Sequence, residues 1–397
     1  MVEFISRGVY EERAASIRAY LAAQGLDALV VFNPDNLLYL SGFMPDVAPW
    51  ERPIACIIPK DGAPELILNE LSTNHIAIAV ARGRCWIENV RIWSEHPRQT
   101  GRLPLRPQWG ALLGHVLLGM GATRAVAVDG AVPYQAAVRA IIPTVEFVPS
   151  EDVIRDMRLV KHTEELALIR AGAAITDRTQ EFYQSQIRPG RLLCDIDGLA
   201  RHFMAVAAAE AFPGARIEPM VIGFCGPESA CPHGPGGNSD MRLAPGQSLI
   251  NIVIIRVNGY VTENERTYFV GEPDDTLAEA FDVMVRAQQA AIDAMRLPNR
   301  VCDFDAAAQS VIESAGFGAH INHRTGHGIG LAGHEYPDDT AFNYRPLAPG
   351  MVFSAEPGLY FPDHGGVRHD DTVFVTDGAP EIVTQFPKDR ASLTVHV

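Results

Sequence analysis

A change in hydrophobic pattern near residue 155 divides this 397-residue chain into two parts. Before it, short helical and strand-like stretches alternate, which is typical of an α/β domain. After it, long amphipathic helices and strand-like runs rich in Val, Ile, Thr and Tyr indicate an α+β domain. A chain of this length is too long for one ordinary core. We therefore predict a smaller N-terminal domain over residues 1–155 and a larger C-terminal domain over 156–397.

In the first part, Ile17 and Leu21 recur at helical spacing and predict a helix over residues 11–24. Short apolar runs bounded by Gly, Pro or Asp predict strands at 28–32, 54–58, 66–68 and 125–128. Asn33, Pro34 and Asp35 are turn-forming residues and predict a turn after the first strand.

In the second part, the periodicity predicts helices at 163–183, 195–210, 276–296 and 303–315. Strand-like runs lie between and after them. On one such strand Glu263 and Glu265 alternate with Asn264. Because successive side chains of a strand point to opposite faces, both glutamates should face the same side of the sheet.

Composition bears on the partners of the chain. It has 48 acidic and 33 basic residues and a formal net charge of −15, whereas nucleic-acid binding requires a basic face. No apolar run approaches the roughly 18 residues of a membrane-spanning helix, and no signal peptide is visible. Its six cysteines lack CxxC spacing, which fits reduced thiols. We expect a cytoplasmic enzyme with a small-molecule substrate, without nucleic-acid or membrane partners.

Four blocks in the second part concentrate acids, histidines and glycines. They span residues 259–267, 326–335, 356–360 and 365–372. Within them, Glu263 and His327 are 64 residues apart, His327 and Glu356 are 29 apart, and Glu356 and Asp370 are 14 apart. One block alone is a weak signal, but this order and spacing are specific. In these blocks the chain resembles the family of aminopeptidase P, prolidase, methionine aminopeptidase and creatinase.

The resemblance covers the C-terminal half and, more loosely, the N-terminal part. It implies a pita-bread fold for the α+β domain, preceded by a smaller α/β domain of the creatinase type. In the metal-dependent members, two aspartates, a histidine and two glutamates bind a pair of divalent ions. The resemblance places four of these roles on Glu263, His327, Glu356 and Asp370.

The chain departs from this ligand set. The position of the first aspartate falls at Asn251 or Ile252, Glu263 replaces the second aspartate, and Asp370 replaces the last glutamate. Paired hard cations depend on bridging carboxylates, so these changes should weaken a two-metal site severely. We therefore expect no cofactor. Four candidate ligands remain, and this number is sufficient for a single divalent metal ion.

Glu265 stands where the metal enzymes usually carry Thr, and in this the block resembles creatinase. Creatinase is the metal-free member, which hydrolyses a carbon–nitrogen bond of a guanidinium compound. The resemblance implies that Glu265 and Glu356 hold a cationic substrate and that His233 acts as general base and acid. The two glutamates would polarise the substrate carbon toward attack by water.

Arg52 resembles the arginine with which the N-terminal domain of creatinase reaches the substrate carboxylate across a dimer. The resemblance therefore implies a homodimer in which each N-terminal domain contributes to the neighbouring site. A second arginine for that carboxylate is missing, because residues 336–339 carry two acids instead. We therefore expect a substrate that is less acidic than creatine.

Our leading hypothesis is a metal-independent hydrolase that cleaves a non-peptide C–N bond of a small guanidino- or amidino-like cation. Its catalytic residues are His233, Glu265 and Glu356. Its substrate-binding residues are Arg52, Glu263, His327, His334 and Asp370. One alternative is a metal-dependent Xaa-Pro dipeptidase or aminopeptidase P, or a metal-using lyase of the same fold. Another is a non-catalytic binding module.

Overall fold

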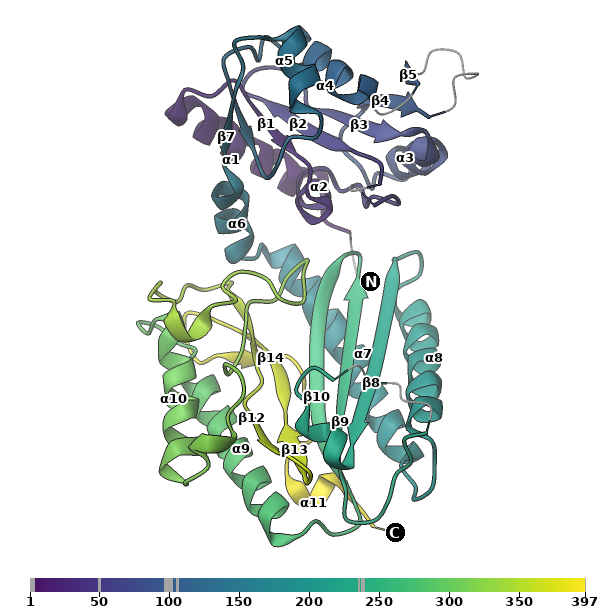
Figure 1. The fold of residues 1–397 in the computed structure, drawn as a ribbon, viewed down its shortest axis with the longest axis vertical. Helices are drawn as coiled ribbons and strands as arrows, with labels where there is room; N and C mark the ends of the chain where they lie inside the picture. The colour runs from purple at the N-terminus through teal and green to yellow at the C-terminus, as the bar shows by residue number, and fades with distance from the viewer. Residues whose placement is uncertain are drawn as a thin grey trace. The chain divides into compact units, whose positions relative to one another are not determined.

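The computed structural model describes residues 4–48, 51–95, 103–104, 107–234, 236 and 240–396. The chain forms two compact units (Figure 1). The first spans Phe4–Arg158, and the second begins at Leu159. In these described ranges, no helix is both long enough and apolar enough to cross a membrane.

The first unit contains a mixed sheet of seven described strands in the order β5-β4-β3-β2-β1-β6-β7. The pairs β1–β2 and β2–β3 are antiparallel, and the other pairs are parallel. The strands are β1 (Ala28–Val31), β2 (Ala55–Pro59), β3 (Glu65–Asn69), β4 (Asn89–Ser94), β5 (Leu103–Pro104), β6 (Ala125–Val128) and β7 (Glu146–Pro149). The helices are α1 (Arg7–Gln24), α2 (Pro34–Ser41), α3 (Thr73–Ala81), α4 (Pro107–Gly119), α5 (Gln135–Ile141) and α6 (Glu151–Leu159).

The elements predicted for this unit coincide with observed ones, with one exception at Asn33. The Asn33 side chain accepts hydrogen bonds from the backbone nitrogens of Asp35 and Asn36, and α2 begins at Pro34. Asparagine as the N-cap followed by proline in the first helical position starts a helix. The predicted turn is therefore wrong, because these residues begin α2.

The second unit contains a sheet in the order β11-β14-β10-β9-β8, with β15 beside β14 and β16 beside β10. A separate hairpin pairs β12 with β13. The strands are β8 (Ile217–Cys225), β9 (Ser248–Val257), β10 (Tyr260–Val270), β11 (Val352–Ala355), β12 (Gly358–Phe361), β13 (Gly365–Arg368), β14 (Asp370–Phe374), β15 (Glu381–Ile382) and β16 (Thr394–Val395). The helices are α7 (Thr163–Gln186), α8 (Leu193–Ala211), α9 (Asp275–Ala294), α10 (Val301–Ser314) and α11 (Arg390–Leu393). The predicted α+β character is confirmed.

The two faces of β10 have different surroundings. One face packs against α7, where Thr262 Oγ1 donates a hydrogen bond to the Ile169 carbonyl oxygen at 2.8 Å. The other face carries Glu263 and Glu265, which line a cavity. Both glutamates thus lie on one face, as their alternation with Asn264 predicts. The sheet and α7 fix the direction of these two side chains before any ligand is bound.

Candidate active site

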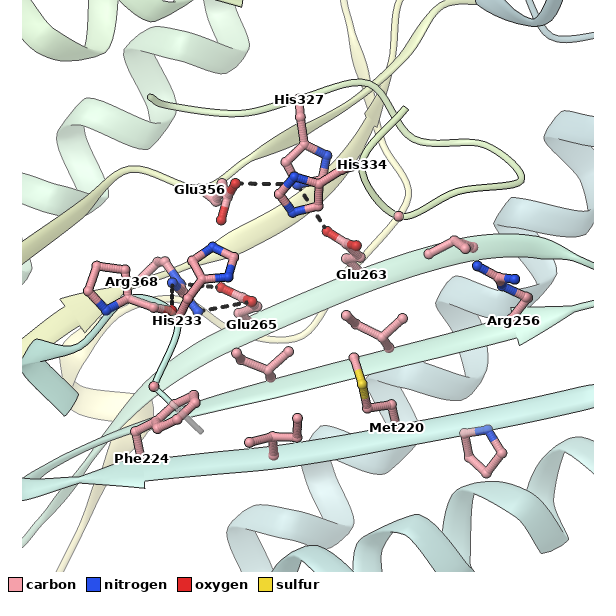
Figure 2. A pocket seen from close by; sticks show the side chains of 18 of the residues that line it. Met220, Phe224, His233, Arg256, Glu263, Glu265, His327, His334, Glu356 and Arg368 are labelled. Carbon is pink, nitrogen blue, oxygen red and sulfur yellow. Dashed lines mark hydrogen bonds and ion pairs between the residues drawn. The ribbon is translucent and has the colours of Figure 1, made fainter. Parts of the chain in front are cut away.

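A cavity of about 860 Å³ lies in the second unit, over the face of β8–β10 that carries the two glutamates (Figure 2). Its apolar lining on β8 and β9 comprises Met220, Ile222, Phe224, Ile252 and Ile254. Its charged lining includes Glu263, Glu265, His327, Glu356 and Arg368. Figure 2 shows Arg368 and Arg256 at opposite ends of this lining. The cavity therefore combines an apolar wall with two differently placed cations.

The glycines of block 326–335 bring the backbone of His327 close to β11. A Cβ atom on Gly326 would lie 2.1 Å from the carbonyl oxygen of Ser354. The backbone nitrogen of Ser354 donates to the carbonyl oxygen of His327, and the His327 nitrogen donates to Ser354 Oγ, both at 2.9 Å. A Cβ on Gly328 would similarly lie 2.6 Å from the carbonyl oxygen of Glu335. This close packing requires glycine and holds the His327 ring in the cavity.

The imidazole of His327 lies between two carboxylates. Its Nε2 is 3.3 Å from Glu356 Oε1 and 3.5 Å from Glu263 Oε2, and all three side chains are buried. Burial alone would lower the pKa of His327, but the two glutamates outweigh it and raise this pKa to about 9. Burial likewise tends to raise the pKa of Glu356, yet the hydrogen bond and charge of His327 lower it. The three side chains therefore form a charged group in which His327 is the cation.

Glu265 forms a separate buried ion pair with Arg368. Arg368 Nε donates to Glu265 Oε2 at 2.5 Å, and its Nη2 donates to Glu265 Oε1 at 3.2 Å. The remaining Nη1 donates to the carbonyl oxygen of Pro232 at 2.8 Å and to the Tyr360 hydroxyl at 3.3 Å. Burial lowers the pKa of Arg368, but Glu265 more than offsets this and raises it. The guanidinium is thus charged and fixed by four oxygen acceptors.

Asp370 is a fully buried acid at the start of β14, opposite Glu265 in the register of β10 and β14. Its Oδ1 accepts a hydrogen bond from the backbone nitrogen of Ala355 at 3.1 Å. Its Oδ2 is buried without a hydrogen-bond partner among the described residues. Burial raises the pKa of Asp370, and the neighbouring Glu263 and Glu265 raise it further. Such an acid lacks the cation that usually balances buried carboxylates.

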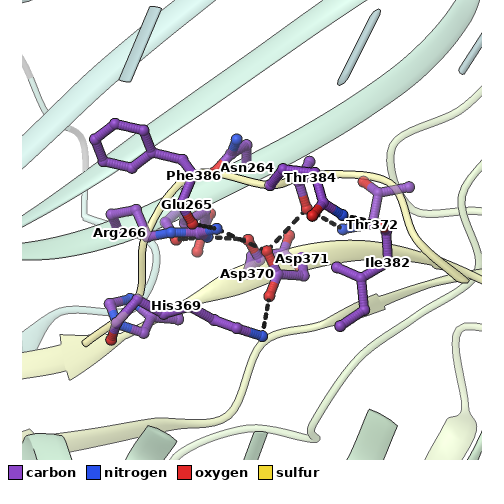
Figure 3. Close-up of polar contacts among 12 residues, drawn as sticks. Asn264, Glu265, Arg266, His369, Asp370, Asp371, Thr372, Ile382, Thr384 and Phe386 are labelled. Atoms are coloured by element: carbon purple, nitrogen blue, oxygen red, sulfur yellow. Dashed lines mark hydrogen bonds and ion pairs between the residues drawn. The ribbon is translucent and has the colours of Figure 1, made fainter. Parts of the chain in front are cut away.

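The next residue, Asp371, points to the other side of β14 and has full compensation (Figure 3). Its Oδ1 accepts from Arg266 Nη2 and from Thr384 Oγ1, and its Oδ2 accepts from Lys388 Nζ, each at 2.8 Å. Burial raises the pKa of Asp371, but Arg266 and Lys388 lower it to about 2. This structural ion cluster anchors β14 and leaves Asp370 directed toward the glutamates.

Two further histidines extend from His327 along the cavity. The ring of His334 stacks on that of His327 with centroids 3.9 Å apart, and its Nδ1 lies 3.2 Å from Asp338 Oδ1. Burial lowers the pKa of His334, and the charge of His327 lowers it further. The exposed His233 follows Pro232, and its ring centroid lies 6.0 Å from that of His334. The structure thus brings His233 close to His327 and His334, which lie about a hundred residues further along the chain.

Arg52 belongs to the first unit and is half-buried there. Its Nε donates to Glu95 Oε2 at 3.1 Å, and its Nη1 donates to Glu51. Both partners are acids of the same unit, and its side chain is 22% exposed. The contacts of Arg52 within its own chain are therefore ordinary ion pairs near the surface.

The pairing of β9 with β10 shows which residue of this chain stands where the metal-dependent members carry their first aspartate ligand. Ile252 lines the cavity and lies opposite Glu265, whereas Asn251 lies opposite Arg266 and is fully buried. Alternation along β9 directs Asn251 away from the cavity. Its amide atoms also lack hydrogen-bond partners among the described residues. Asn251 therefore cannot serve as a ligand in this cavity, and an isoleucine occupies the aspartate position.

Three residues of the site are not singled out by the sequence reasoning. Arg368 lies within block 365–372, two residues before the candidate ligand Asp370. A basic residue so close to that acid could have been identified as a site residue from the sequence. Arg256 alternates with the cavity-lining Ile252 and Ile254 on β9, which also suffices to place it there. His323 is given no role by the sequence, yet its Nε2 lies 2.7 Å from the Tyr360 hydroxyl. Its contact depends on tertiary packing and leaves no sequence signal.

Comparison with known proteins assigns the class of this fold and site. The model of Metallopeptidase family M24 matches residues 167–377, and the model of the Creatinase/Prolidase N-terminal domain matches residues 13–160. The first match covers more than half of the chain. The chain therefore belongs to metallopeptidase family M24, with a creatinase-type N-terminal domain followed by the pita-bread domain. The predicted superfamily and fold are confirmed.

The similar proteins include several named as dipeptidases. The "probable dipeptidase PepE" of Mycobacterium bovis is 33% identical over 389 residues, which cover 96% of both chains. The solved structure of dipeptidase PepE from Mycobacterium ulcerans is 31% identical, covers 100% of both chains and has a TM-score of 0.82. The prolidase of Pyrococcus horikoshii shares the fold, with 24% identity, a TM-score of 0.80, and coverage of 95% of this chain and 99% of its own.

These findings correct two expectations. The creatinase-like function is wrong, because relatives spanning the chain are named dipeptidases. The physical reason is that Arg368 neutralises Glu265, so the expected pair of glutamates is not available to hold a substrate cation. The expectation of no cofactor is also wrong, because the family is one of metallopeptidases. The chain is a hydrolase of this family, which sets aside the non-catalytic binding module.

Proposed function

We propose that this protein is a metal-dependent dipeptidase and that Xaa-Pro dipeptides are among its substrates. The observation that carries the proposal is that Glu263, His327 and Glu356 contact one another in the cavity and that Asp370 is buried beside Glu263. The family supports the metal, and the names of the relatives support a dipeptide substrate. A volume of about 860 Å³ and an apolar wall suit a small substrate rather than a long chain.

The residues present fit a divalent metal ion. The uncompensated Oδ2 of Asp370 is a buried oxygen donor that a cation would satisfy. Glu263, His327, Glu356 and Asp370 would hold the ion, and three carboxylates with one imidazole suit Mn²⁺, Co²⁺ or Zn²⁺. Among the described residues, no three such side chains already surround a common point. His327 Nε2 instead contacts both glutamates, so it must release its proton to become a ligand.

A bound ion would supply a Lewis acid and a water of lowered pKa at neutral pH. The chain supplies the groups that handle protons beside it. His334 stacks on His327, and its lowered pKa leaves a neutral imidazole that accepts a proton. His233 is exposed at the open side and remains our candidate for returning a proton to the leaving amine. Arg368 binds the Pro232 carbonyl and so positions the loop that carries His233.

Arg256 is our candidate for binding the substrate carboxylate. It lines the cavity on β9 and has no hydrogen-bond or ion-pair partner among the described residues. Glu218 lies opposite Arg256 in the register of β8 and β9 but pairs with Arg216 instead, at 3.0 Å. Arg256 also lies opposite Val261, two residues along β10 from Glu263. Such diagonal positions are about 7–8 Å apart, which suits the short span of a dipeptide.

A metal-reconstitution assay tests the proposed function. The protein is stripped with a chelator and assayed against a panel of Xaa-Pro and other dipeptides, with Mn²⁺, Co²⁺ or Zn²⁺ restored singly. We expect hydrolysis of some dipeptides only after metal is restored. Hydrolysis that persists in fully stripped protein, or an inactive reconstituted protein across the panel, contradicts the proposal. His327→Gln is the matched control, because it removes a proposed ligand without adding charge.

We propose that the enzyme acts in a reducing compartment such as the cytoplasm. All six cysteines are free, including the four that are buried. Free thiols persist where glutathione and thioredoxin keep them reduced. Active enzyme in a cytosolic fraction after cell fractionation is the expected result, and recovery only from a secreted fraction contradicts it.

We also propose a homodimer in which Arg52 of one chain serves the site of the other. The support is the resemblance of the segment around Arg52 to that of creatinase. Within the described part of its own chain, Arg52 makes partly exposed ion pairs with Glu51 and Glu95. Such partly exposed pairs contribute little to stability, so they do not prevent the guanidinium from contacting another chain.

A further inference from the structure

The charges of the site are divided between two ends. At one end the carboxylate of Glu265 is matched by the guanidinium of Arg368. At the other end, Glu263 and Glu356 contact the imidazole of His327, while Asp370 lies among the acids Glu263, Glu265 and Glu356. A buried carboxylate is costly unless a cation or hydrogen bonds compensate it. The two ends therefore differ in their capacity to receive a positive ion.

The end at Glu265 has no place for a metal ion. Both oxygens of Glu265 accept hydrogen bonds from Arg368, at 2.5 and 3.2 Å. Directly opposite on β9 stands Ile252, whose side chain offers no donor. Arg368 is itself held in place by Pro232 and Tyr360. An ion at this end would have to displace a buried guanidinium from Glu265, and the residues opposite Glu265 on the neighbouring strands offer it one further carboxyl group, that of Asp370.

The end at Asp370 has the opposite character. Glu263 and Glu356 contact the His327 imidazole there, and Asp370 lies beside Glu263. No donor among the described residues hydrogen-bonds to the buried Oδ2 of Asp370. Three carboxylates and one nitrogen are enough to hold a single divalent ion, with water completing the coordination. Only this end of the site therefore both needs a cation and can bind one.

From this division we infer that the site takes one divalent ion rather than two, at Glu263, His327, Glu356 and Asp370. The guanidinium of Arg368, fixed on Glu265, supplies the positive charge that a second ion supplies in two-metal hydrolases. The inference rests on the proposed metal-dependent function and specifies the metal site of that function. It makes Arg368 a positioning and electrostatic residue rather than a ligand.

Metal stoichiometry tests the inference without reference to turnover. Stripped protein is titrated calorimetrically with Mn²⁺ and, separately, with Zn²⁺, and the dialysed product is analysed for bound metal. We expect one ion per chain. Two tightly bound ions per chain overturn the inference but leave the dipeptidase proposal standing. No binding to the folded protein overturns both, whereas one ion without dipeptide hydrolysis overturns only the proposed function.

Two variants locate the ion. Glu263→Gln removes a proposed ligand and should weaken Mn²⁺ binding by about a hundredfold, the cost of a lost charged contact. The double variant Glu265→Gln with Arg368→Met removes the buried pair without changing net charge. It should still bind one ion, with a Kd within about threefold of the original, while turnover falls. A loss of metal binding in the double variant would show that Glu265 is a ligand and would overturn the inference.

Discussion

Arg256 and Arg368 line the same cavity, but their surroundings give them different tasks. Arg368 is buried and satisfied by Glu265, Pro232 and Tyr360, so its charge is fixed within the protein. Arg256 is partly exposed and unpaired among the described residues, so its charge is available to a ligand. A guanidinium binds a carboxylate through two parallel hydrogen bonds. If the proposed dipeptidase function holds, the free carboxylate of the dipeptide is the expected partner of Arg256.

Replacing Arg256 by Met should raise KM for dipeptides by roughly 10- to 100-fold, because one charged hydrogen-bonded contact contributes about 1.5–3 kcal/mol. Dipeptide amides lack the carboxylate and should be cleaved equally by both proteins. Steady-state kinetics with matched acids and amides measures this difference. Arg216→Met is the control, because Arg216 pairs with Glu218 and does not line the cavity. Equal losses on acids and amides would contradict the assignment.

Asp197 gives a pH dependence of stability that is separate from the active site. Its Oδ2 accepts from the backbone nitrogen of Gly223 and its Oδ1 from the Tyr183 hydroxyl. Burial raises the pKa of Asp197 to about 6, above its ordinary value of 3.8. The folded state therefore binds this proton more tightly than the unfolded state. The stabilisation is complete below pH 3.8 and is lost as pH rises through 6.

The free energy of unfolding should thus fall by roughly 2–3 kcal/mol between pH 4 and pH 7 on account of Asp197. In Asp197→Asn this contribution disappears, because the amide does not titrate. Urea denaturation of both proteins at several pH values measures it. The difference between the two curves isolates Asp197 from the other acids, and parallel curves would show that its pKa is unperturbed.

Single residues were predictable where spacing identifies them and unpredictable where packing does. The separations among Glu263, His327, Glu356 and Asp370 identify candidate residues; in the structure His327 contacts Glu263 and Glu356, and Asp370 is buried opposite Glu265. The choice between Asn251 and Ile252 could not be made, because a shift of one residue moves a side chain to the other face of the sheet. The pairing of Glu265 with Arg368 joins β10 to β13, and such long-range contacts leave no local pattern.

At the scale of elements, hydrophobic periodicity predicted the long helices well. The predicted helix 163–183 is α7, and the predicted helix 303–315 corresponds to α10. The predicted turn at Asn33 failed because the same residues, Asn and Pro, occur in turns and at helix starts. What decides between them is the apolar side chains of α2 that follow, including the fully buried Leu37 and Leu40.

The glycine-rich segment before β11 is an element whose sequence follows from its packing. Gly326→Ala would place a methyl group 2.1 Å from the Ser354 carbonyl oxygen, so the segment carrying His327 must move away from β11. We expect a loss of roughly 2–4 kcal/mol in the free energy of unfolding. Metal affinity should fall as well, because His327 is displaced. Thermal denaturation and calorimetric Mn²⁺ titration measure the two effects.

The control for this variant is Gly198→Ala on α8. A Cβ at Gly198 meets no atom within 4 Å, so alanine should leave metal binding unchanged and raise stability by up to about 1 kcal/mol. If both alanine variants behave alike, close packing is not the reason for glycine at position 326.

At the scale of the whole molecule, the change of pattern near residue 155 and the four sequence blocks sufficed for the fold and the family. They did not suffice for the function. Glu265 was interpreted as a free acid, and only the folded chain reveals that Arg368 neutralises it. Predicting the function therefore required the charge balance of the site. That site is assembled from β10, β13 and the segment at Pro232, and no single sequence block contains all three.

The proposed sharing of Arg52 between chains is testable by complementation. Arg52→Ala and His327→Ala should each be inactive alone, because one lacks the arginine and the other lacks a metal ligand. In a mixed dimer, one site combines an intact His327 with the partner's intact Arg52. Random pairing of co-expressed variants should therefore restore about a quarter of the original activity.

The matched control for complementation is co-expression of His327→Ala with Glu356→Ala. Both defects lie in the same pita-bread domain, so every site of every mixed dimer remains defective and no activity should return. Light scattering of the purified proteins measures whether dimers form at all. Recovery by neither pair, in preparations that are dimeric, would place the role of Arg52 within its own chain, in its contacts with Glu51 and Glu95.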